Sequence, residues 1–186
     1  MTFTIISAIE MYVNIDNRDI IQTIFSTGIN ELEVWKSAVK DDNRLFNKLF
    51  QFIFSDDKRL AMRSCWIIDN ASEEFPDLLS DKLPEIIDAL LSTKNGSLKR
   101  HFTRILCRYE IPENYLGAIV NRSFELLAPS EPVSVRVHAM QLLFNIARIV
   151  PDLKGELILV IENLREEESS AGFINRSGKL LQQLKH

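Results

Sequence analysis

Residues 131–151 read EPVSVRVHAMQLLFNIARIVP and contain a pattern that recurs along the chain. Four apolar residues follow the spacing i, i+3, i+4, i+7, which brings their side chains onto one face of an α-helix. They are Ala139, Leu142, Leu143 and Ile146. Pro151 closes the stretch, because proline lacks the amide hydrogen that a continuing helix requires. The stretch therefore predicts an amphipathic helix near 133–150.

Pairs of adjacent apolar residues recur at nearly constant intervals. The first series has a regular spacing and consists of Ile67-Ile68, Ile105-Leu106, Leu142-Leu143 and Leu180-Leu181. A second series lies between these pairs, has a looser spacing around the same period, and consists of Leu49-Phe50, Ile86-Ile87, Ile119-Val120 and Val160-Ile161. Prolines follow members of the first series at Pro76, Pro112 and Pro151. This periodicity predicts stacked two-helix units, because a single helical hairpin cannot bury its own apolar stripe.

The predicted fold class is all-α, an α-α superhelix of helical hairpins with a period of about 37 residues. First helices are expected near 57–74, 97–109, 133–150 and 172–185, and second helices near 80–91, 113–127 and 152–164. The expected caps of the first helices are Asp56 or Asp57, Ser97, Ser130 or Ser134, and Ser170. We expect a single solenoid domain over residues 1–186. Its parts are an irregular N-terminal unit and cap (1–55), repeats 56–94, 95–129 and 130–169, and a C-terminal capping helix (170–186).

This organisation resembles the HEAT and armadillo-type α-solenoids over roughly residues 40–186. Four stretches also resemble a family of small HEAT-like proteins from Bacteroidetes bacteria: RLAMRSCW (59–66), EPVSVRVHAMQ (131–141), PDLKGEL (151–157) and SAGF (170–173). Some members of that family are labelled adenylosuccinate lyase. This sequence does not support that activity, because Ser169-Ser170 is followed by Ala-Gly-Phe and not by the S-S-x-M-P-x-K-x-N type of loop found in that lyase superfamily.

The composition is that of an ordinary globular chain, with 186 residues, 46% hydrophobic residues and a formal net charge of −4. The N-terminal stretch has no basic start and contains Glu10, so no export signal is expected. The longest uninterrupted apolar run, Leu157–Ile161, is too short to cross a membrane. Cys65 and Cys107 stand isolated among apolar residues, which indicates free thiols in a reducing compartment. We therefore expect a cytoplasmic protein with no membrane partner.

Motifs that would indicate catalysis are missing. His101, His138 and His186 stand alone, without the clustered spacing of metal ligands. No glycine-rich phosphate loop and no nucleophile elbow occurs in the sequence. The acidic groups at 56–57 and 166–168 lie at expected helix edges, where caps and solvated faces explain them. We expect no metal site, no cofactor and no enzymatic activity.

Aligning the first helices by their apolar pairs brings twelve polar or aromatic residues into register. They occupy positions i, i+3 and i+7, which lie in one sector of a helix. They are Arg63, Trp66, Asn70, His101, Arg104, Arg108, His138, Gln141, Asn145, Arg176, Lys179 and Gln183. This aligned row is a candidate surface for binding a partner. The alternative is a structural ladder that bridges neighbouring repeats.

Charge is segregated between the two kinds of helix. Nine Lys or Arg residues and no Asp or Glu lie in the first-helix windows 97–109, 133–150 and 172–185. The formal charge summed over the second-helix windows 80–91, 113–127 and 152–168 is −7. A nearly neutral molecule is therefore expected to carry a basic side and an acidic side. The electrostatic field of such surfaces guides charged partners during association.

The favoured function is a non-enzymatic scaffold or adaptor that binds another macromolecule, either a protein or an acidic peptide. The alternative function is that of a DNA-binding protein similar to the HEAT-like DNA alkylation-repair glycosylases, which use aromatic and acidic residues in a basic groove. Trp66 with Asp69 is the candidate pair for such a site, and Trp35 is the other tryptophan of the chain. The negative net charge disfavours nucleic acid as a partner. Self-association through the apolar N-terminus is a third possibility, and the oligomeric state stays open. The residues concerned are Ile5, Ile6, Ile9, Val13 and Ile15.

Overall fold

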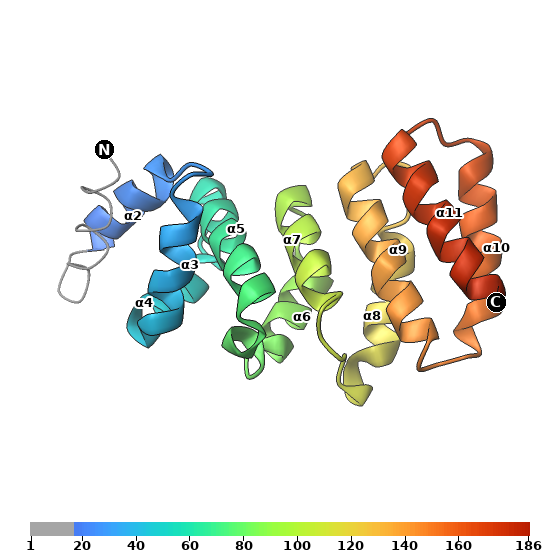
Figure 1. Ribbon diagram of the computed structural model, residues 1–186, viewed down its shortest axis with the longest axis horizontal. Coiled ribbons are helices and arrows are strands. Elements are labelled where there is room, and N and C mark those ends of the chain that lie inside the picture. Colours follow the sequence, from blue (N-terminus) through green and yellow to red (C-terminus); the bar gives the residue numbers. More distant parts are fainter. Residues whose placement is uncertain (1–16) are drawn as a thin grey trace. The chain divides into compact units, whose positions relative to one another are not determined.

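The computed structural model of the protein describes residues 17–186 (Figure 1). These residues form ten α-helices and two short 3-10 helices, with no strand in the described part. The chain divides into two compact units, one ending at Lys82 and the other spanning Leu83–His186. The boundary falls inside the expected repeat 56–94, and a single solenoid domain over 1–186 stays a prediction. The apolar N-terminal residues proposed for self-association lie outside the described residues.

The first unit is organised around one long helix. Its elements are α2 (Asn17–Ser26), α3 (Leu32–Asp41), α4 (Asn43–Phe52), α5 (Lys58–Glu74) and η2 (Pro76–Leu79). Helices α2, α3 and α4 all pack against α5, whose Ile67 and Ile68 are fully buried. Trp35 of α3 is also fully buried, and its indole Nε1 donates a 2.7 Å hydrogen bond to Thr27 Oγ1. This bond satisfies the one polar group of the largest side chain in the core.

The second unit consists of two layers of helices (Figure 1). Its elements are α6 (Leu83–Ser92), α7 (Gly96–Leu106), η3 (Glu113–Tyr115), α8 (Leu116–Glu125), α9 (Val133–Ala147), α10 (Leu153–Glu166) and α11 (Ala171–Lys185). In the first layer, α9 lies between α7 and α11. In the second layer, α6 packs on α7, α8 on α9, and α10 on α11. Each second helix therefore packs against the first helix of the next repeat, and this contact is what stacks the repeats.

The apolar pairs mark equivalent core positions in successive repeats. Ile105, Leu142 and Leu180 lie on the successive helices α7, α9 and α11, and each is at most 2% exposed. In the second series, Ile119 and Ile161 are fully buried. The all-α prediction and the prediction of a helical repeat are therefore confirmed.

The expected caps are correct for only one of the first helices. Asp57 caps α5, because its carboxylate accepts hydrogen bonds from two backbone amides of the first turn. Helix α7 is capped by Asn95 and not by Ser97, since the helix begins one residue earlier than expected. Helix α9 follows Pro132 without a side-chain cap, and Ser170 occupies the cap position of α11 without bonding to its amides.

Candidate interaction surface

In the first unit, the three residues of the aligned row are engaged within their own unit. The Arg63 Nε donates a 3.2 Å hydrogen bond to the Ile24 carbonyl, and an amino group of the same guanidinium donates to the Thr27 carbonyl. Arg63 thus holds the C-terminal end of α2, where helix carbonyls lack partners. Its guanidinium also lies 5.2 Å from the ring centroid of Trp66, and Asn70 Nδ2 donates to the Trp66 carbonyl.

In the second unit, four residues form a ladder of hydrogen bonds across the first layer. Arg176 of α11 donates to Gln141 Oε1 of α9. The Gln141 Nε2 donates to Asn145 Oδ1 at 2.7 Å, and Asn145 Nδ2 donates to the Cys107 carbonyl at 2.8 Å. The ladder joins α11 and α9 to the end of α7. Gln141 and Asn145 therefore bridge neighbouring repeats, as expected if the aligned row is a structural ladder and not a binding surface.

The remaining residues of the row differ in exposure. His101 is buried and its Nε2 lies 3.0 Å from an amino group of Arg100, whereas His138 is half-buried. Arg104 and Arg108 are half-buried. Lys179 and Gln183 of α11 are exposed, and neither side chain makes a hydrogen bond or ion pair within residues 17–186. Those two residues are the part of the row that a partner can reach without breaking a bond.

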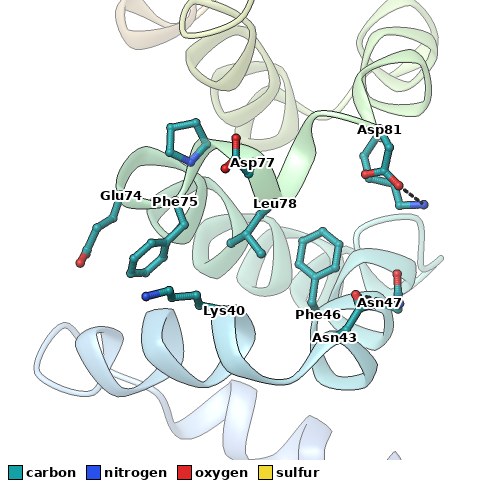
Figure 2. A pocket seen from close by; sticks show the side chains of 11 residues that line it. Lys40, Asn43, Phe46, Asn47, Glu74, Phe75, Asp77, Leu78 and Asp81 are labelled. Atoms are coloured by element: carbon teal, nitrogen blue, oxygen red, sulfur yellow. Dashed lines mark hydrogen bonds and ion pairs between the residues drawn. The ribbon is translucent and has the colours of Figure 1, made fainter.

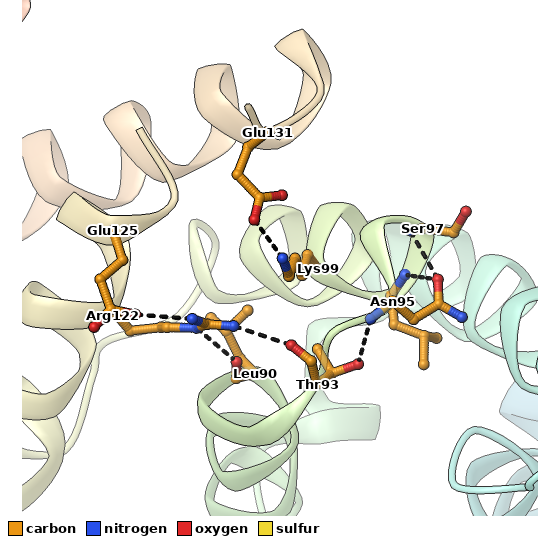
Figure 3. Close-up of polar contacts among 9 residues, drawn as sticks. Leu90, Thr93, Asn95, Ser97, Lys99, Arg122, Glu125 and Glu131 are labelled. Carbon is orange, nitrogen blue, oxygen red and sulfur yellow. Dashed lines mark hydrogen bonds and ion pairs between the residues drawn. The ribbon is translucent and has the colours of Figure 1, made fainter. Parts of the chain in front are cut away.

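Two ion pairs occupy equivalent positions in successive repeats. Lys99 of α7 pairs with Glu131 (Figure 3), and Arg136 of α9 pairs with Glu168. The two cations lie one repeat apart in the sequence, and so do the two acids. Each pair joins a first helix to the turn before the next first helix. Sequence reasoning missed these pairs because it compared positions only within helices, and it interpreted the acidic group 166–168, which includes Glu168, as caps or a solvated face. The shared spacing of one repeat was available as a signal.

A further arginine closes the end of α6. The Arg122 side chain of α8 donates hydrogen bonds to the carbonyls of Leu90 at 3.2 Å and Thr93 at 3.0 Å (Figure 3). These carbonyls lie at the C-terminal end of a helix, where no amide of the same helix reaches them. The arginine therefore has a structural role in joining successive second helices.

The environment of Glu168 lowers the pKa of its carboxyl group. The main cause is the backbone amide of Ser170, which donates a 2.8 Å hydrogen bond to Glu168 Oε1, and the Arg136 guanidinium acts in the same direction against the effect of desolvation. A lowered pKa in the folded state stabilises the protein above the unfolded-state pKa of about 4.3. This contribution is lost as the pH falls through the folded-state value.

We expect Glu168→Gln to reduce the dependence of stability on pH. The variant should be less stable than the wild type at pH 7, and the difference in melting temperature should shrink as the pH falls below about 4.3. Thermal unfolding followed by circular dichroism between pH 7 and pH 3 measures this change. Glu167→Gln serves as the control, because Glu167 is exposed. A difference that stays constant over this pH range would contradict the prediction.

Several of the acidic and aromatic candidates have structural positions in the described part of the chain. Asp57 is a helix cap, and Glu168 holds Arg136. Asp69 is buried on α5 and Trp35 is fully buried, so neither lines an open groove. Within residues 17–186, no three His, Cys, Asp or Glu side chains are placed to hold a metal ion. None of the helices described there combines the length and the apolar content of a membrane-spanning helix.

Two hollows border the turns that follow first helices. In the first unit, a cavity of about 670 Å³ lies between α3, α4 and the turn after α5, with Phe46, Phe75 and Leu78 among its lining residues (Figure 2). In the second unit, a cavity of about 570 Å³ is lined by residues of the turns after α7 and α9. Both cavities combine apolar side chains with carboxylates.

Comparison with known proteins identifies the repeat. The HEAT repeat domain family matches residues 20–184, which cover both units. No curated protein and no solved structure matches the chain. The match agrees with the apolar pairs that are buried on successive helices. The chain therefore belongs to the HEAT repeat domain family, and it is a helical repeat scaffold.

Proposed function

We propose that the protein is a non-enzymatic scaffold that binds an acidic segment of a partner protein on the first layer of its second unit. The observation that carries the proposal is the sign of the charge on this layer. Helices α7, α9 and α11 contain seven Lys or Arg residues and no Asp or Glu. Solenoids bind partners through surfaces of this kind, which spread many weak contacts along stacked helices.

The ion pairs narrow the region that contacts the partner. Lys99, Arg136 and Lys185 are neutralised by glutamates from turns and from α10. Lys179 is exposed and makes no ion pair within the described part of the chain, and Gln183 lies one turn further along the same helix. The proposed contact region is therefore centred on α11. Arg104 and Arg108 of the same aligned row are half-buried and make interactions within the chain, so they lie outside this region.

Charge reversal at Lys179 should weaken partner binding. A photo-crosslinking amino acid placed at Gln183 should capture a partner in the cell that makes the protein, and Lys179→Glu should reduce the captured amount by about tenfold. A loss of this size corresponds to about 1.4 kcal/mol, which is reasonable for one cation that meets an acidic surface. Mass spectrometry identifies the captured protein and shows whether its contacting segment is acidic.

Two controls make the result specific. Lys94→Glu makes the same charge change at an exposed residue between α6 and α7, and it should leave capture within about twofold. The same crosslinker at Asn121, which is exposed on α8, should not capture this partner. Equal capture from both positions, or capture that Lys179→Glu leaves unchanged, would reject the proposed surface.

A further inference from the structure

One short motif recurs at the ends of the first helices. Residues 74–77 read EFPD, residues 110–113 read EIPE, and residues 149–152 read IVPD. Each copy begins shortly after an apolar pair of the first series. In each copy, an apolar residue precedes a proline and an acid follows it. The repeat therefore places an apolar side chain beside a carboxylate at each of these turns.

In the first unit, two lysines of the chain contact its own copy of this motif. Lys36 Nζ forms a 2.7 Å ion pair with Glu74, and Lys40 Nζ lies 4.6 Å from the ring centroid of Phe75 (Figure 2 shows Lys40 facing Phe75). Both lysines belong to α3, and residues four apart lie on the same side of a helix. In the first unit, lysines of α3 therefore contact both the carboxylate of Glu74 and the aromatic ring of Phe75.

In the second unit, the EIPE and IVPD turns meet around the cavity of about 570 Å³. The residues that line it are Glu110, Ile111, Pro112, Glu113, Leu116, Ile149 and Val150. Ile149 is 60% exposed and Val150 is 36% exposed. Glu110 and Glu113 are exposed, and neither forms an ion pair within residues 17–186. The cavity therefore combines exposed apolar side chains with two carboxylates that lack a cation.

The chain has no lysine in the register that serves the first unit. Lys36 precedes Glu74, and Lys40 precedes Phe75, by approximately one repeat length. The residues at the same sequence distances before Glu110 and Ile111 are Ser72 and Pro76. Neither can supply a positive charge. The EIPE turn therefore has no cation at the sequence positions that supply one to the EFPD turn.

We propose that the cavity formed by the turns after α7 and α9 binds an amphipathic helix of a partner protein that carries lysines four residues apart. An apolar residue of this helix covers Ile149 and Val150, and the two lysines face Glu110 and Glu113. Burial of the exposed apolar pair supplies affinity, and the carboxylates supply orientation and charge selectivity. The site lies away from Lys179 in sequence and has the opposite charge, so it does not depend on the proposed function.

A designed peptide tests this site directly. The probe is a fluorescein-labelled helical peptide with the pattern K-x-x-L-K, which copies the register of Lys36, Val39 and Lys40. Fluorescence anisotropy with the full chain should show saturable binding that weakens with salt. Glu110→Lys/Glu113→Lys should weaken binding by about tenfold or more, and Glu110→Gln/Glu113→Gln should weaken it by a smaller factor. A peptide with glutamate in place of both lysines should not bind.

The control variant makes the same charge change elsewhere in the second unit. Glu156→Lys/Glu166→Lys alters two exposed residues of α10 and should leave the affinity within about twofold. Circular dichroism checks that all variants fold. Failure of the lysine peptide to bind, or equal binding to the wild type and to Glu110→Lys/Glu113→Lys, would overturn the proposal. So would sedimentation that shows self-association lost in that variant, because the occupant would then be a second copy of the chain.

Discussion

Replacing Leu143 by alanine should lower the free energy of unfolding by about 3 kcal/mol. Leu143 is fully buried on α9, the helix that lies between α7 and α11 and also contacts α8 and α10. Truncation leaves a cavity that these packed helices cannot close without moving several contacts at once. Urea unfolding monitored by circular dichroism measures the change through the transition midpoint, with the slope as a check on cooperativity.

The matched control is another leucine of the same unit. Leu159 of α10 is 63% exposed, so Leu159→Ala should change the free energy of unfolding by no more than about 0.5 kcal/mol. The contrast between two leucines tests the repeat register, because the spacing places Leu143 in an apolar pair and leaves Leu159 outside one. Equal effects of the two substitutions would mean that the pairs do not mark the core.

The helices and their core were predictable because burial leaves a strong periodic signal. Apolar pairs such as Ile105-Leu106 recur once in every repeat, and stacked hairpins require such repetition at equivalent positions. The helix boundaries were less predictable. Asn95 and Ser97 are both good capping residues, and which of them caps the helix depends on where the preceding turn places the first backbone amide of α7.

The candidate surface was predictable only as a set of positions on helices. The spacing placed Gln141 and Asn145 on one side of α9, but their hydrogen bonds depend on side-chain rotamers and on the distance to α7 and α11. Pairs such as Lys99 with Glu131 join a helix to a turn, so a comparison of helical positions does not contain them. The EIPE turn and the residues Ile149 and Val150 become one site only through the packing of successive repeats.

Replacing Arg136 by methionine should lower the free energy of unfolding by about 3 kcal/mol, comparable to the loss at Leu143. Arg136 is buried, its Nε donates a 3.1 Å hydrogen bond to the Leu127 carbonyl, and its guanidinium pairs with Glu168. The guanidinium also lies 4.4 Å from the ring centroid of Phe173. Methionine keeps much of the apolar volume but leaves a carbonyl and a carboxylate without their donor, and such groups are costly when buried.

A second substitution separates the lost ion pair from lost packing. In the double variant Arg136→Met/Glu168→Met, no carboxylate remains without its cation, so the protein should be more stable than with Arg136→Met alone. Arg148→Met is the control, because Arg148 is exposed at the end of the same helix and should change stability by no more than about 0.5 kcal/mol. Urea unfolding of the three variants gives the comparison. Equal stability of Arg136→Met and the wild type would show that the pair with Glu168 does not stabilise the contact between these repeats.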